Sequence, residues 1–233
     1  MILQWIKHLT RAALVLALCI SSNGYAAEDP LPSWNDGTTK QSILDYVTRV
    51  TKEGGPDYVK LKDRLATFDN DGTLWIEQPM YNQFVFAIDE VKKEANQHPD
   101  WKTKEPFKSV LAGDMKAVAA MGEKGMVEIV AATHSGMTTA DFDAAVRQWL
   151  ATSKHPRFKV LYTDLVYQPM LELLAYLRAN GFKTFIVSGG GVEFMRNFAD
   201  KTYGIPAELI GRYKIRNVGR EAGPNQGTEG PVP

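Results

Sequence analysis

Two aspartates, Asp69 and Asp71, stand one residue apart in the stretch FDNDGT at residues 68–73. The stretch follows the segment RLATF at 64–68, which is typical of a short buried strand. One carboxylate can attack phosphorus and form an acyl phosphate, while a second acts first as acid and then as base. The pair is therefore a candidate site for phosphoryl transfer, and Gly72 lets the backbone approach a substrate closely.

Other interpretations of the same stretch can be checked by counting. A calcium loop of the EF-hand type that began at Asp69 would need Gly at position 6 and Glu at position 12. Those positions hold Leu74 and Met80, so the calcium loop is excluded. A plain turn built on an aspartate followed by glycine stays open as the alternative.

A second cluster, IVSGGG at residues 186–191, predicts another strand end, with Ser188 at its tip. Backbone N–H groups at the start of a following helix can bind anions. No GK[ST] follows, as a P-loop requires, and Phe194 occupies the last glycine position of GxGxxG. Ile186 stands where a nucleophile elbow requires glycine. Together, a strand end with serine and amides and a strand end with two aspartates predict a phosphate site.

The order of the surrounding elements determines whether the two clusters meet. Helices alternate with strands on both sides of a long helical stretch, which predicts right-handed crossovers, a parallel sheet and an α/β fold. In such a sheet, ligands sit beyond the carboxyl ends of the strands. The expected elements are a helix at 40–50, a strand at 64–68, a helix at 168–182, a strand at 183–188, a helix at 192–204 and a strand at 208–217.

The stretch from 76 to 165 shows helical spacing and no regular strand alternation, which predicts a helical insertion. We expect three helices in it, within 78–97, 105–122 and 138–153. Met126 has the character of an ordinary helix-packing residue. For Trp75, just before the insertion, covering the site and packing in the core are both open.

The two ends of the sequence differ in composition from the rest. Residues 1–26 carry Lys7 and Arg11, then a short apolar core, then a small–x–small pattern, which is the layout of a secretory signal. Cleavage after Ala26 would remove Cys19, the only cysteine, and would leave 25 basic residues against 27 acidic ones. That balance argues against a nucleic-acid binder.

The 15 residues from 219 to 233 are rich in glycine and proline without an apolar period, so we expect a disordered tail. The predicted domains are therefore a signal at 1–26, a core formed by 27–75 and 166–218, and a helical cap at 76–165 that precedes the second part of the core.

The two motifs in this order, DNDGT at 69–73 and VSGGG at 187–191 with a helical insertion between them, resemble the haloacid dehalogenase superfamily of hydrolases. The similarity covers about residues 60–215 and is greatest for the phosphoserine-phosphatase-like branch. The resemblance implies a Rossmann-like parallel-sheet core with an inserted helical cap of the C1 type. It also implies a phosphomonoester hydrolase that depends on Mg²⁺.

The same resemblance assigns roles to particular residues. Asp69 would be the nucleophile and a Mg²⁺ ligand, and Asp71 would be the general acid and base, with its carbonyl on the metal. Ser188 and the Gly189 amide would hold the phosphoryl group. Glu77 matches a position that faces the substrate amine in that branch, and a solvated surface acid is the alternative.

The chain departs from the family in two motifs. Neither the charge-balancing lysine nor the late acidic motif is found, and Lys214, the only late lysine, lies inside the expected last strand. We therefore expect a C-terminally shortened member. Its strand at 64–68 would have one unpaired edge and an apolar face without cover, as in an aggregation-prone chain.

The sequence thus predicts an exported, periplasmic phosphatase that acts through an aspartyl-phosphate on a small phosphorylated metabolite such as phosphoserine. It would bind no nucleic acid and no membrane after signal cleavage, and the sequence is silent on oligomeric state. One alternative is an inactive remnant that only binds phosphate or a partner. Another is a phosphotransferase that passes the phosphoryl group to an alcohol.

Overall fold

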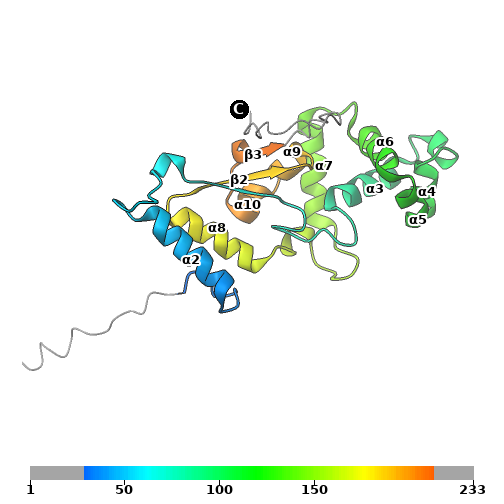
Figure 1. Ribbon diagram of the computed structural model, residues 1–233. Coiled ribbons are helices and arrows are strands. Elements are labelled where there is room, and N and C mark those ends of the chain that lie inside the picture. The colour runs from blue at the N-terminus through cyan, green and yellow to red at the C-terminus, as the bar shows by residue number, and fades with distance from the viewer. Residues whose placement is uncertain (1–28, 213–233) are drawn as a thin grey trace, which may run out of the picture. The chain divides into compact units, whose positions relative to one another are not determined.

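The computed structural model describes residues 29–212 of the 233-residue chain (Figure 1). The chain divides into two units, residues 1–30 and residues 31–233, and the helices and strands of the described range all belong to the second. The predicted signal at 1–26, Lys214 and the predicted tail at 219–233 all lie outside the described residues. No described helix has both the length and the apolar character that a membrane span requires.

The centre of the fold is a parallel sheet of three strands in the order β1-β2-β3. β1 (Leu65–Phe68) pairs with β2 (Lys183–Ser188), and β2 pairs with β3 (Ile210–Arg212). The parallel pairing confirms the predicted α/β class. Because Phe68 lies opposite Ile186, the two strands end at the same edge of the sheet, and the residues after them emerge side by side.

Four helices lie outside the long stretch between β1 and the second half of the core. They are α2 (Thr38–Thr51), which precedes β1, and α8 (Gln168–Ala179), α9 (Val192–Arg196) and α10 (Ala199–Tyr203), which lie before and after β2. α8 has Pro169 in its first turn, where the missing N–H has no intrahelical partner. Its chain leaves the helix through Gly181, whose φ of +79° is left-handed. Apolar residues of α2 and α8 share one hydrophobic cluster beside the sheet.

The helix expected over 192–204 is two short helices, α9 and α10. Asn197 and Phe198 separate them, and Phe198 has a φ of −136°, outside the helical region. Its ring is buried and stacks on Trp75, so the break turns a large aromatic side chain into the core.

Between the two strands lie α3 (Asn82–Glu94), α4 (Phe107–Ala112), α5 (Met115–Ala120), α6 (Gly122–His134) and α7 (Thr139–Thr152). The single helix expected over 105–122 is wrong. Gly113, with a φ of +73°, ends α4, and the Asp114 side chain caps α5. α6 was not expected, because Gly122 and Gly125 weaken its helical pattern. The remaining short elements are 3₁₀ turns at Leu61–Asp63, Pro99–Lys102, Tyr162–Asp164 and Ala207–Leu209.

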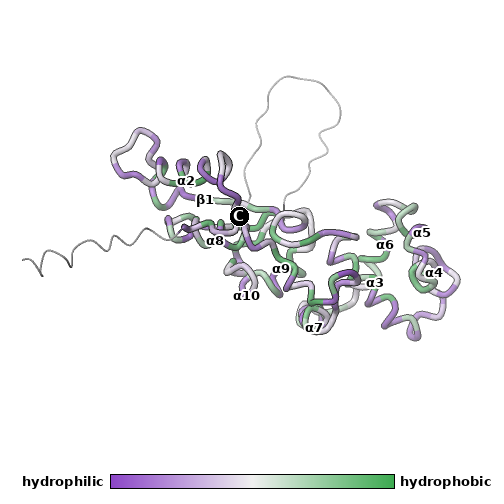
Figure 2. Tube along the Cα trace, turned by 90° about the horizontal axis from the view of Figure 1, so that it is seen from below, coloured by the Kyte–Doolittle hydropathy of each residue, from purple (hydrophilic) through white to green (hydrophobic). Residues whose placement is uncertain are grey.

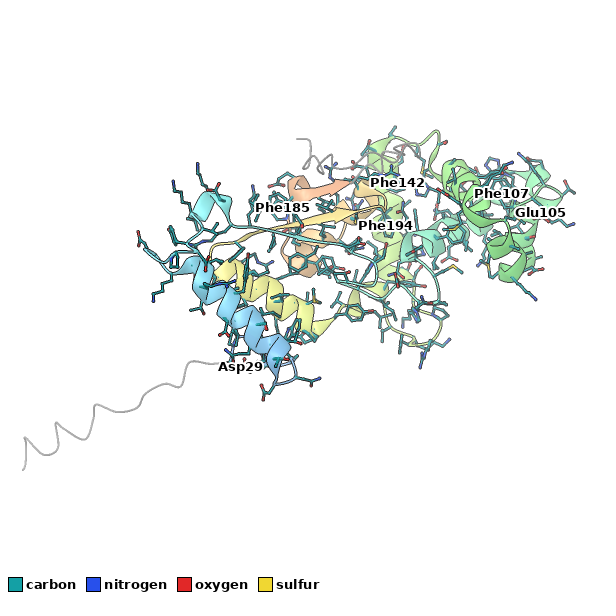
Figure 3. The ribbon with its side chains drawn as sticks, viewed as in Figure 1. Asp29, Glu105, Phe107, Phe142, Phe185 and Phe194 are labelled. Carbon is teal, nitrogen blue, oxygen red and sulfur yellow. The ribbon has the colours of Figure 1, made fainter. Side chains whose placement is uncertain are left out.

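Packing divides these five helices into two groups. Residues of α3, α4, α5 and α6 bury one another in a cluster that includes Trp101 and Phe107. α7 instead contributes to the cluster around the sheet, where Phe142 of α7 and Phe194 of α9 both lie (Figure 3). Apolar residues recur along α6, α7 and α9, shown in green in Figure 2.

β1 stands at an edge of the described sheet, as the sequence predicts, but the expectation that its apolar face lacks cover is wrong, because Ala66 and Phe68 pack against the cluster that α2 and α8 share. Leu65 is 59% exposed on it, and Thr67 is also exposed. A groove of about 600 Å³ runs beside β1 between residues of α2 and α8, and none of the predicted site residues lines it.

Candidate active site

The loop after β1 is folded tightly around the main-chain carbonyl of Asn70. This oxygen accepts hydrogen bonds from the N–H groups of Leu74 at 2.8 Å and Thr73 at 3.2 Å. Gly72 has a φ of +70° and donates its N–H to the Trp75 carbonyl at 2.9 Å. The turn therefore needs glycine at this place, and it holds the residues before and after Asn70 at the carboxyl edge of the sheet.

Asp71 is held by Trp75. The indole Nε1 donates to Asp71 Oδ1 at 2.7 Å, while the fully buried ring stacks on Phe198 with centroids 4.4 Å apart. Trp75 is thus a core residue that also orients an acid, a role that sequence reasoning missed. The signal available was the i, i+4 spacing of an aspartate and a tryptophan within one turn.

The buried Asn70 provides a second anchor beneath the loop. Its Oδ1 accepts a hydrogen bond from the Tyr203 hydroxyl at 3.1 Å, and both side chains are almost fully buried. Burial raises the pKa of Tyr203, and the negative charge of Asp71 nearby adds to the effect. The hydroxyl therefore stays protonated and continues to donate, which fixes the loop from α10.

The pKa of Asp71 is raised above its ordinary value. Burial is the main cause, and the negative charges of Asp69 and Glu77 add to it, while the hydrogen bond from Trp75 opposes it. A carboxyl with a raised pKa holds its proton to a higher pH and can donate it to a leaving group. A raised pKa is one property that a general acid needs.

Glu77 lies against Gly72. A Cβ at Gly72 would stand 2.8 Å from Glu77 Cδ and 2.9 Å from Oε2, closer than real Cβ atoms come. Gly72 thus serves both its left-handed turn and the close approach of the Glu77 carboxylate. Glu77 is partly buried, and the alternative of a solvated surface acid stays open.

The loop after β2 supplies the second half of the site. Ser188 is the last residue of β2 and is 3% exposed. Its Oγ accepts the N–H of Gly190 at 3.3 Å, and the N–H of Gly191 donates to Gln83 Oε1 at 2.7 Å. Gly189, between them, is exposed.

One cavity of about 350 Å³ brings these pieces together. Asp69, Asp71, Glu77, Ser188 and Gly189, the five residues that the sequence singles out, all line it. The rest of its wall comes from Gly190 and from the helical insertion, through residues that sequence reasoning did not assign to the site: Tyr81, Gln83, Phe84, Met126 and Val130.

The insertion side of the cavity is mostly apolar, since Phe84 and Val130 line it together with Met126, which the sequence indicated only as a packing residue. Among the described lining residues none is Lys, Arg or His, so the acids give the cavity a negative character. A single sequence shows no signal for these apolar positions, because helical spacing alone does not separate a cavity wall from a core.

Within the described range no group of three or more His, Cys, Asp or Glu side chains is arranged to hold a metal ion. Mg²⁺ needs less from the protein, because it keeps several waters and binds one or two carboxylates together with substrate phosphate. Asp69 and Asp71 line the cavity and supply oxygen ligands of this kind, and none of the described lining residues is cationic, so the residues present fit such an ion.

The class of this protein is defined by a parallel α/β sheet in which two aspartates follow one strand, a serine ends the next and is followed by glycines, and a helical insertion lies between the two strands. The sequence matches the model of the haloacid dehalogenase-like hydrolase family over residues 66–231, and the chain belongs to that family. The match confirms the resemblance drawn from the two motifs.

A phosphoserine phosphohydrolase-like protein from Francisella tularensis subsp. tularensis SCHU S4 is among the solved structures that are similar. It is 19% identical with a TM-score of 0.36, and the match covers 64% of this chain and 57% of that one. The chain thus spans less than two thirds of that protein's length. Among curated proteins, no match was found.

Proposed function

We propose that this chain is an exported phosphomonoester hydrolase that depends on Mg²⁺ and acts through an aspartyl-phosphate. The observation that carries the proposal is the cavity in which Asp69 and Asp71, from one strand end, face Ser188 and Gly189, from the next. Family membership supports a hydrolase. The composition of residues 1–26, outside the described residues, supports export to the periplasm.

In the first step an oxygen of the Asp69 carboxylate attacks phosphorus, and the bond from phosphorus to the ester oxygen breaks. Asp71 gives its proton to that oxygen, so the product leaves as a neutral alcohol. In the second step the Asp71 carboxylate takes a proton from water as the water oxygen attacks phosphorus. The bond to Asp69 breaks, inorganic phosphate leaves, and both acids return to their starting states.

The other residues hold the phosphoryl group in place. The Ser188 hydroxyl and the Gly189 amide would donate to its oxygens, which concentrates donors where charge develops. Mg²⁺, bound by the Asp69 carboxylate and the Asp71 carbonyl, would offset the negative charge of carboxylates and phosphate when it is present.

The size of the cavity supports a small substrate. About 350 Å³ is at the small end of ligand sites, which favours a small phosphorylated metabolite. Phosphoserine is the first compound to test, because the sequence motifs are closest to that branch. Glu77 is available to an amino group on the alcohol, as the resemblance implies.

The test uses the protein recovered after export. Hydrolysis of p-nitrophenyl phosphate is measured with Mg²⁺ and with EDTA, for wild type, Asp69→Asn and Asp71→Asn. Asp164→Asn, an exposed aspartate away from the cavity, is the matched control. We expect turnover with Mg²⁺ only, loss of it in both cavity variants, and a phosphorylated Asp69 that accumulates in Asp71→Asn and is detected by mass spectrometry.

Two outcomes would replace this proposal. Folded wild type without turnover in Mg²⁺ would favour the inactive, phosphate-binding alternative. A new phosphate ester that appears when an alcohol is added, in place of inorganic phosphate, would identify a phosphotransferase.

A further inference from the structure

Gln83 connects the helical insertion to the glycine loop of the site. It lies in the first turn of α3, and its Oε1 accepts the N–H of Gly191, 108 residues later in the chain, at 2.7 Å. The same side chain lines the cavity with Asp71 and Ser188. Among the described residues, the bond between Gln83 and Gly191 is the only hydrogen bond between a side chain and the main chain that joins α3 to the loop at 189–191.

Gly191 is shaped to receive this side chain. A Cβ on Gly191 would overlap the Gln83 amide nitrogen and would stand 2.9 Å from Oε1 and 3.0 Å from Cδ. The φ of Gly191 is −72°, which any residue adopts. A side chain at this position would therefore disturb the contact with Gln83 without straining the backbone.

The neighbouring Gly190 shows where the Gln83 amide stands. A Cβ on Gly190 would lie 3.8 Å from Gln83 Oε1, 3.8 Å from Asp71 Oδ2 and 3.6 Å from Ser188 Oγ. The three groups therefore converge on one point of the glycine loop. One of them comes from the insertion and two come from the strand ends.

We propose that Gln83 is a positioning residue that orders the glycine loop for the phosphoryl group. Three successive glycines are costly to order, because glycine loses more backbone freedom than any other residue when its conformation is fixed. The Gln83 bond meets part of that cost before substrate arrives, which is preorganisation. The inference rests on the proposed function and adds a means by which the position of the insertion affects phosphate binding.

The test is a double-mutant cycle of Gln83→Ala, Gly191→Ala and the double variant. Gly191→Ala displaces the Gln83 amide without deleting it, and this displacement is cheap because the amide is the end of a flexible chain. In Gln83→Ala the clash is gone, so the second change should add little. Gln97→Ala, an exposed glutamine of the same insertion outside the cavity, is the control.

Two measurements are made on each variant in Mg²⁺. The first is amide hydrogen exchange in the peptide that contains residues 189–191. The second is the KM for p-nitrophenyl phosphate together with the inhibition constant of inorganic phosphate. We expect both single variants to lose protection in the loop and to raise KM and the inhibition constant about three- to tenfold, the size of one net hydrogen bond, with kcat within about twofold.

The proposal is overturned if Gln83→Ala leaves exchange and the inhibition constant unchanged, or if the two changes add in the double variant. It is also overturned if kcat falls while KM stays constant, since that result would place the effect in the chemical step. If wild type has no turnover, the proposed function fails, while hydrogen exchange and calorimetric binding of inorganic phosphate still decide the role of Gln83.

Discussion

Replacing Trp75 by phenylalanine keeps an aromatic ring against Phe198 and removes the N–H that holds Asp71. Trp149→Phe is a close control, because Trp149 is also buried and its Nε1 donates to Asp89 Oδ2 at 3.0 Å. Both variants lose the same part of an indole. The comparison therefore isolates what happens to the carboxylate that is left behind.

The exposure of the acceptor determines the expected difference. The Asp89 side chain is 39% exposed, so water can replace the indole, and we expect a loss of about 1 kcal/mol. Asp71 is partly buried in the cavity, and a hydrogen bond to such a carboxylate contributes about 1.5–3 kcal/mol. For a chain of this length, each kcal/mol lowers the unfolding midpoint by about 2–4 °C.

The cost of Trp75→Phe should also depend on pH. The bond favours the ionised form of Asp71, and its loss raises the pKa of that carboxyl further above 3.8. The cost is thus fully present at a pH where Asp71 is ionised. It shrinks as the pH falls through the raised pKa, because a bond to the neutral acid is about half as strong.

Urea unfolding followed by circular dichroism in EDTA measures both effects without a bound cation. Wild type and the two variants are compared from pH 7 downward for as long as wild type stays folded. Equal losses in the two variants at pH 7 would refute the reasoning, as would a Trp75→Phe deficit that grows on acidification.

Two further predictions concern His134 and Gly72. Burial lowers the pKa of His134 below 6.5, so the unfolded chain binds more protons near that pH and the free energy of unfolding falls as the pH drops through it. His134 lies between Phe86 and Phe142, and His134→Phe should weaken the pH dependence of the unfolding free energy that urea titrations give between about pH 7.5 and 5.5. An unchanged pH dependence would contradict this. Gly72 and Gly54 both have a left-handed φ, so Gly72→Ala and Gly54→Ala should each lower the free energy of unfolding in urea by about 1–2 kcal/mol. Only Gly72→Ala displaces Glu77, so only this variant should lower the turnover of a phosphate ester that carries an amine. Equal turnover in the two variants would argue against a role for Glu77.

Much of the core could be predicted because its signals are local. The apolar residues before Asp69 and before Gly189 predict two strands, and helices between them predict parallel pairing. The helical insertion was predicted less well. Gly113 and the Asp114 cap divide an apolar pattern that continues across them, and α6 contains two glycines that disfavour a helix. Tertiary burial of Ile129 overrides that preference.

The site residues also divide into those that could be predicted from the sequence and those that could not. Asp69 and Asp71 follow β1 and Ser188 is the last residue of β2, so the fold alone brings them to one edge. Gln83 and Val130 reach the cavity from helices of the insertion, and their places depend on how those helices pack. No spacing within one sequence encodes a contact such as that of Gln83 with Gly191, because it joins residues 108 positions apart.

The pairing of β1 with β2 has a consequence for how the chain folds. Residues 65–68 and 183–186 are separated by roughly a hundred residues, more than half of them helical, so the sheet closes only after a long loop has been drawn together. The α3–α6 helices bury one another through contacts close in sequence, and such contacts form early. The insertion would then shorten the effective loop, and the two halves of the cavity would be among the last parts of the protein to meet.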